Sequence, residues 1–162
     1  MKNIEFPSLG SRNIKTGLAV LICLLFWQNS LFAPIAAVIC MQDTVENSLK
    51  IGRNRLIGTL LGGILGLIFL TTIDFFSLKP ILPLVTAIGV ILIIYSCNVI
   101  KKPAACSIAS IVLIGILISN GYDDPLMYSI RRTIETAFGV VVAILINMYI
   151  HPPKEKKLDK SN

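Results

Sequence analysis

Long apolar runs are the feature that most constrains what this chain can form. Four runs, at positions 56–73, 81–100, 103–119 and 133–150, contain one charged residue between them, Glu135. A helix needs about 20 apolar residues to cross the hydrocarbon core of a bilayer. With 54% hydrophobic and 15% charged residues, the chain has too few polar side chains to cover a soluble domain. The sequence therefore predicts an all-α integral membrane protein.

A fifth apolar stretch, residues 16–41, is long for one span and short for two. Its middle, FWQNSLFAP at 26–34, contains turn-forming residues and a helix-breaking proline. As a hairpin it gives six spans with both termini in the cytoplasm, and only Lys79, Arg131 and Arg132 of the fifteen basic residues lie outside. If residues 16–41 form one span, at best nine of the fifteen basic residues lie inside and six lie outside. Because basic residues tend to stay in the cytoplasm, the hairpin is favoured, with its two spans short or tilted.

This topology divides the chain into three segments of a multi-pass membrane protein: a cytoplasmic segment (1–13), a six-span membrane domain (14–150, with halves at about 14–73 and 80–150) and a charged cytoplasmic tail (151–162). Before the third span, Asp43 and Glu46 have the spacing of a capping box. The helix that follows reaches about Thr71 and should be about 42 Å long. Its first three turns are therefore expected to protrude into the cytoplasm.

One motif occurs twice, 77 residues apart. The segments RLIGTLLG (55–62) and RTIETAFG (132–139) both read R-x-I-x-T-x-x-G and lead into long apolar helices. The segments before them, APIAAVICM from Ala33 and KPAACSIASIV from Lys102, match loosely. The chain thus resembles two three-span units. Because three is odd, the second unit crosses the membrane in the opposite sense, which is the inverted repeat found in many transporters.

Each copy of the motif places an arginine, a threonine and small residues on one helix face: Arg55, Thr59, Gly62 and Gly66 in the third span, and Arg132, Thr136, Gly139 and Ala143 in the sixth. Gly58, Gly62 and Gly66 form overlapping GxxxG patterns, so these glycines and Gly139 are predicted to pack against neighbouring helices. The arginines and threonines are candidate substrate-binding residues at the two ends of a shared path. Alternatively, the arginines are topology anchors that reach lipid headgroups.

Glu135 is the one acidic residue well inside a predicted span. Its spacing allows an ion pair with either Arg131 or Arg132. An ion pair that only neutralises an arginine is one interpretation. The other is a proton-coupling carboxylate, because intramembrane acids often mark ion pathways.

Other chemistry is not indicated. His151 is the only histidine, and the four cysteines lie in apolar runs without a CxxC pair. We therefore expect no metal, no cofactor and no catalytic residues, and the sequence does not indicate an enzyme. The excess of basic residues follows the membrane topology, so we expect no nucleic-acid partner.

The segments SRNIKTGLAVLI and APIAAVICMQDTVENSLKIGRNRLIGTLLGGILG resemble the aromatic acid exporter family of the fusaric acid resistance superfamily. The resemblance covers about residues 8–150, and the sixth span, RRTIETAFGVVVAILIN, shares it. It implies proton-driven export of aromatic carboxylic acids or related organic anions across the bacterial plasma membrane. Members often carry a soluble domain after the six spans or a second membrane unit. Neither follows here, so we expect a homo-oligomer, with a dimer favoured.

Two functions remain open at this point. A secondary exporter requires a cation for the carboxylate, such as Arg55 or Arg132, and an apolar wall for the ring, such as Phe26, Trp27 or Phe138. A non-transporting scaffold or a subunit of a larger envelope assembly requires only the glycine packing. A partner protein that co-purifies would favour the second function.

Overall fold

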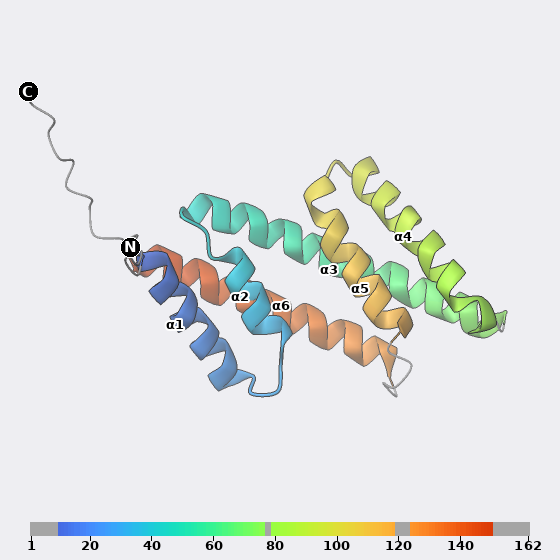
Figure 1. Cartoon of the computed structure of the whole chain (residues 1–162), viewed down its shortest axis with the longest axis horizontal. Helices are drawn as coiled ribbons and strands as arrows, with labels where there is room; N and C mark the ends of the chain where they lie inside the picture. The colour runs from blue at the N-terminus through green and yellow to red at the C-terminus, as the bar shows by residue number, and fades with distance from the viewer. Residues whose placement is uncertain (1–9, 77–78, 119–123, 151–162) are drawn as a thin grey trace, which may run out of the picture.

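The protein is a bundle of helices. The computed structural model describes residues 10–76, 79–118 and 124–150, and the expected cytoplasmic tail lies outside them. The described helices are α1 (Ser11–Phe26), α2 (Phe32–Cys40), α3 (Val45–Phe75), the short 3-10 helix η1 (Lys79–Ile81), α4 (Leu82–Val99), η2 (Pro103–Ala105), α5 (Cys106–Ile118) and α6 (Pro125–Tyr149) (Figure 1). The described part contains no strand, and this confirms the predicted all-α class.

Polar residues define where the helices begin. The interruption predicted within 26–34 is present, because α1 ends at Phe26 and α2 begins at Phe32. Ser30 accepts hydrogen bonds at its hydroxyl from the backbone amides of Phe32 (3.2 Å) and Ala33 (3.4 Å), which satisfies two donors at the start of α2. Asp124 does the same for α6.

The predicted capping box at Asp43 is wrong. The cap of α3 is Thr44, whose hydroxyl accepts a hydrogen bond from the amide of Asn47 at 3.2 Å. The carboxylate of Asp43 instead contacts a guanidinium nitrogen of Arg12 at 3.4 Å. Both residues can cap a helix. Asp43 contacts Arg12, a residue far away in the sequence, and Thr44 caps the helix instead. A local sequence pattern cannot show such a long-range contact.

Two helices, α3 and α4, are long and apolar enough to span a membrane by length and composition. The 31 residues of α3 correspond to about 46 Å. By contrast, α2 has nine residues and is about 14 Å long, well short of the hydrocarbon core. In α6, which has 25 residues, the charged residues Arg131, Arg132 and Glu135 lie in the first half.

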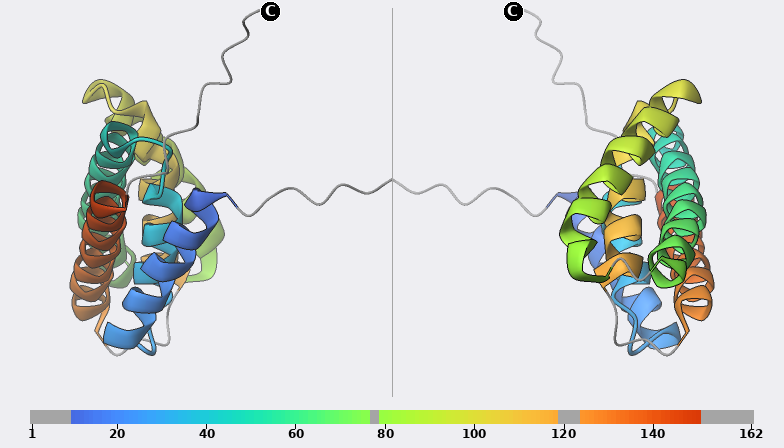
Figure 2. Two further views of the ribbon diagram at one scale, coloured as in Figure 1. Left: turned by 90° about the vertical axis from the view of Figure 1, so that its left-hand side faces the viewer. Right: turned by 90° about the vertical axis from the view of Figure 1, so that its right-hand side faces the viewer.

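Helices α3 and α6 run antiparallel along the long axis and form one layer, and the other four α-helices cover one side of it (Figures 1 and 2). Helices α1 and α2 pack on α6, whereas α4 and α5 pack on α3. The buried apolar residues accordingly form two clusters. One joins α1, α2 and α6 around Ala36 and Ala143, and the other joins α3, α4 and α5 around Ile93 and Leu113.

Glycines bring the backbones of these helices together. A methyl group on Gly62 would overlap the carbonyl oxygen of Ala109 and lie 2.8 Å from the Cβ of Val112, both in α5. A methyl group on Gly139 would overlap the carbonyl oxygen of Ala33 in α2. Gly58 and Gly66 also face α5. Close approach of this kind, with no side chain between the backbones, is how helices associate in lipid.

We predict that Gly62→Ala lowers the free energy of unfolding in detergent by about 1–3 kcal/mol, because the backbones of α3 and α5 must separate. Gly63→Ala should cost less, since a methyl group there meets the hydroxyl of Ser129, which can rotate away. Gly17→Ala is the control: it has open space and should be neutral or slightly stabilising. Equal losses at all three positions would contradict a specific contact at Gly62.

Candidate functional site

A pocket of about 340 Å³ lies where the α1–α2 loop meets the first half of α6. The loop and the start of α2 provide one wall, and α6 provides the other. Its lining combines aromatic, cationic and acidic side chains: Asn29, Ser30, Leu31, Phe32, Tyr128, Arg131, Arg132 and Glu135. We call this the loop pocket.

Arg132 is surrounded by aromatic rings in the loop pocket. Its guanidinium carbon lies 4.0 Å from the centre of the Phe32 ring, and its Nη1 donates a hydrogen bond to the Tyr128 hydroxyl at 2.8 Å. The two rings meet edge to face with their centres 6.2 Å apart. A cation over an aromatic face is attracted by about 0.5–2 kcal/mol. Arg132 is thus held in place without a carboxylate partner among the described residues.

Glu135, 2% exposed, has two polar partners. One carboxylate oxygen accepts a hydrogen bond from Nε of Arg131 at 2.9 Å, and the other accepts one from the Ser30 hydroxyl. Of the two arginines that the spacing allowed, Arg131 forms the ion pair. The Arg131 side chain remains 59% exposed, so one partner of this pair faces the surroundings and the other is buried.

Arg55 and Thr59 lie on α3, outside the loop pocket. Both are buried, and the Thr59 hydroxyl donates to the carbonyl oxygen of Arg55 at 2.9 Å. Arg55 lines a separate cavity of about 120 Å³ between α2, α3 and η2–α5, which we call the Arg55 cavity. Thr136 is buried in α6, one turn after Arg132.

The two arginines of the motif both lie near the crossing of α3 and α6. Gly52 faces Val140 and Gly63 faces Ser129 across this crossing, and the arginines lie between these contacts along their helices. Arg55 and Arg132 therefore share the central region of the bundle, rather than its two far ends.

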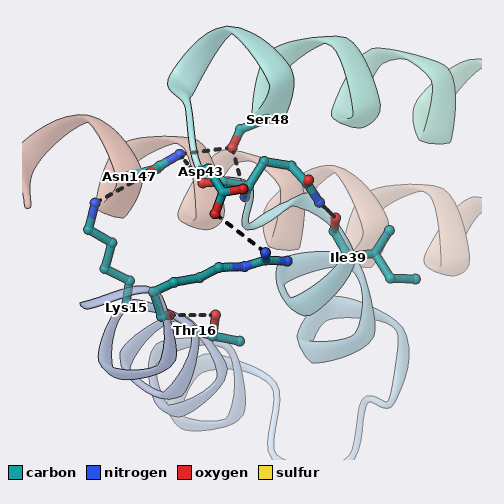
Figure 3. A network of polar contacts seen from close by, with 8 residues as sticks. Lys15, Thr16, Ile39, Asp43, Ser48 and Asn147 are labelled. Atoms are coloured by element: carbon teal, nitrogen blue, oxygen red, sulfur yellow. Dashed lines mark hydrogen bonds and ion pairs between the residues drawn. The ribbon is translucent and has the colours of Figure 1, made fainter. Parts of the chain in front are cut away.

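A second polar cluster closes the other end of the α1–α2 hairpin (Figure 3). Lys15 of α1, which is 5% exposed, donates from Nζ to the side-chain oxygen of Asn147 at 3.1 Å. The amide nitrogen of Asn147 donates to the carbonyl oxygen of Gln42 (2.8 Å) and to the Ser48 hydroxyl (3.0 Å). A buried ammonium is thus bound to a neutral amide, and the amide makes three hydrogen bonds.

Sequence reasoning missed several residues of these sites. Tyr128 lies four residues before Arg132, so helical spacing alone could have indicated the pair. Phe32 and Ser30 reach α6 only through folding, and no local signal identifies them. The position of Lys15 near the start of an apolar run is typical of a topology anchor, but its side chain is buried and binds Asn147.

Comparison with known proteins gives one family. The sequence model of aromatic acid exporter family member 1 matches residues 7–150. The chain is 33% identical over 156 residues to the UPF0421 protein YgaE of Bacillus subtilis, which covers 93% of this chain and 42% of that relative. It is 31% identical over 151 residues to a UPF0421 protein of Staphylococcus epidermidis, covering 90% of this chain and 44% of that relative. The chain therefore spans less than half the length of these relatives.

We predict that Asn147→Leu lowers the free energy of unfolding in detergent by about 3 kcal/mol, because Lys15, Gln42 and Ser48 lose their partner in a buried site. The double variant Lys15→Met with Asn147→Leu should recover part of this loss, since it removes the unpaired ammonium. Asn98→Leu, at an exposed position near the end of α4, should change stability by less than about 0.5 kcal/mol. A double variant no more stable than Asn147→Leu would show that the Lys15 contact contributes little.

Proposed function

The chain belongs to the aromatic acid exporter family, and from this premise we propose that it exports aromatic carboxylic acids or related organic anions across the bacterial plasma membrane, driven by the proton gradient. The observation that supports this most is the position of Arg132 between Phe32 and Tyr128 in the loop pocket. A guanidinium binds a carboxylate through charge-assisted hydrogen bonds. Neighbouring aromatic edges and faces suit a substrate ring.

The size of the loop pocket is consistent with this ligand class. Its volume of about 340 Å³ lies at the lower end of the range for small-molecule sites, about 300–1,000 Å³. In the proposed mechanism the carboxylate binds Arg132 near Thr136 in the loop pocket. The ring would pack against Phe32.

We propose that Glu135 couples this movement to protons. Its carboxylate is bound to Arg131 and to Ser30 of the α1–α2 loop. Protonation would remove the negative charge that holds Arg131 and weaken the link between the loop and α6. The pocket would then open or close with the protonation state, as alternating access requires.

We further propose six membrane crossings in two inverted three-helix repeats. Support comes from the packing pairs, which are the same when α1–α3 are exchanged with α4–α6. Helix α2 packs on α6 as α5 packs on α3, and α1 contacts α2 and α6 as α4 contacts α5 and α3. The shared R-x-I-x-T-x-x-G motif lies on α3 and α6, which this exchange interchanges.

A second function is favoured by one observation. The relatives are more than twice as long as the segment that matches, so the chain can also act as the membrane part of a larger assembly without transporting anything itself. A homodimer would place a second membrane unit beside the first. The apolar groove between α3 and α6, lined by Leu60, Ile64 and Ile134 among others, is open to lipid or to a second copy.

Cysteine labelling tests the topology. In a background without the four native cysteines, Gln28→Cys in the α1–α2 loop should react with a membrane-impermeant thiol reagent added outside intact cells. Asn47→Cys and Asn98→Cys, also at exposed positions, should react only after the membrane is permeabilised. Labelling of Asn47→Cys from outside would rule out the hairpin and six crossings.

Transport by purified protein in liposomes tests the function. We expect efflux of benzoate or hydroxybenzoate that depends on a pH gradient. Arg132→Gln should reduce apparent affinity by about 10- to 100-fold, as loss of a hydrogen bond to a charged group does. Arg132→Lys should retain part of it, because the charge remains but the planar fork is lost. Arg53→Gln, at an exposed position of α3, should behave as the unaltered protein.

The same assay separates the roles of Glu135. As a proton carrier, Glu135→Gln should leave folded protein in the membrane but make efflux independent of the gradient. As a structural ion-pair partner only, it should lower abundance instead. Normal abundance with normal coupled efflux would contradict both roles. No efflux of any aromatic acid by folded protein would favour the membrane subunit of an assembly.

A further inference from the structure

The guanidinium of Arg55 is a buried cation for which the described residues provide no ion pair or hydrogen bond. Arg55 is 8% exposed, and its Nε and one terminal nitrogen are buried with no hydrogen bond among the described residues. No carboxylate of the described part forms an ion pair with it. Buried charges in proteins are normally paired and hydrogen-bonded, because an isolated one is very costly. Arg131 and Arg132, by comparison, both have partners.

The Arg55 cavity lies directly beside this cation. Its volume is about 120 Å³, and its other lining residues are Ile39, Ile51, Asn54, Ala104 and Ile108. This volume is smaller than that of a cavity known to bind benzene, about 150 Å³, so the site suits a small ion better than an aromatic acid. A cavity of 120 Å³ holds a small ion with one or two waters, at about 30 Å³ per water.

The chemistry of the lining limits the charge of a ligand. Arg55 supplies one positive charge, Asn54 supplies one amide, and the remaining lining side chains are apolar. Thr59 is unavailable because its hydroxyl donates to the carbonyl oxygen of Arg55. A divalent anion would be left with an uncompensated charge in an apolar site, which is strongly unfavourable. A monovalent anion is neutralised by the arginine.

The repeated motif points to the same conclusion. In the copy on α6, the position after R-x-I is Glu135, a carboxylate that neutralises a neighbouring arginine. In the copy on α3 the same position is Gly58, where the backbone of α5 leaves no room for a side chain. The α3 copy thus provides a cation but no acid.

We propose that the Arg55 cavity is a binding site for a small monovalent inorganic anion of the size of chloride or nitrate. The anion accepts hydrogen bonds from the Arg55 guanidinium and stabilises the contact between α2, α3 and α5. This site is distinct from the loop pocket proposed for the aromatic acid. Anion binding at the Arg55 cavity does not require that the protein transports an aromatic acid.

The first test measures stability at constant ionic strength. The melting temperature of the purified protein, followed by the fluorescence of Trp27, its only tryptophan, should rise when chloride or nitrate replaces gluconate. The rise should grow with the logarithm of the anion concentration and reach about 3–6 °C for an anion at ten times its Kd. Arg55→Gln should abolish it and Arg53→Gln should retain it. No anion-specific rise in the unaltered protein, or the same rise in Arg55→Gln, would overturn the proposal.

A direct binding measurement keeps the test decisive if Arg55→Gln does not fold. Equilibrium binding of radiolabelled chloride should give one ion per chain, with weaker binding in Arg55→Lys and unchanged binding in Arg132→Gln. Benzoate should stabilise the protein through Arg132 and should not displace chloride. One-for-one displacement of chloride by benzoate would assign the Arg55 cavity to the aromatic acid. That outcome overturns this inference but leaves the proposed export intact.

Discussion

The fold depends on direct contact between helix backbones at glycine and alanine. In a bilayer, burying an apolar side chain between helices gains little over leaving it in lipid, so van der Waals contact and hydrogen bonds must hold the bundle together. Gly62 lets α3 reach the backbone of α5, and Gly139 lets α6 reach the backbone of α2. The short helix α2 has little surface of its own to contribute. Its contact with α6 brings the α1–α2 loop to Arg132 and Glu135, so the loop pocket depends on this packing.

Three buried ionisable side chains and the half-buried Arg132 are accommodated in four different ways. The ammonium of Lys15 binds an amide, the carboxylate of Glu135 binds an arginine and a hydroxyl, and the guanidinium of Arg132 lies among aromatic rings. Arg55 has none of these partners within the described part of the chain. The first three arrangements join the α1–α2 hairpin to α6. The α4–α5 hairpin packs on α3 through apolar and small residues in the described part, so the polar links are concentrated on one half of the bundle.

Much of the architecture is predictable from sequence, because it follows from local physical rules. The helix break before Phe32 follows from turn residues and proline, and the second part of α3 follows from the uninterrupted apolar run at 56–73. Features that need distant partners are less accessible, such as the cap at Thr44 and the ring of Phe32 over Arg132. The loose sequence match that pairs Ala33 with Lys102 also differs from the pairing that the packing shows. Gly139 faces Ala33 whereas Gly62 faces Ala109, so the counterpart of Ala33 in packing lies two helical turns beyond Lys102.

The shortness of α2 has an electrical consequence. Polar clusters lie at both of its ends, Ser30 with Glu135 at one and Gln42 with Ser48 and Asn147 at the other, about 14 Å apart along nine residues. A membrane potential falls over the distance that separates the two aqueous phases. A charge that crosses it gains or loses about 2.3 kcal/mol per 100 mV. In the proposed six-crossing topology, water that reached both clusters would confine that drop to about half the thickness of the hydrocarbon core, and an anion that moved beside α2 would experience about twice the usual field.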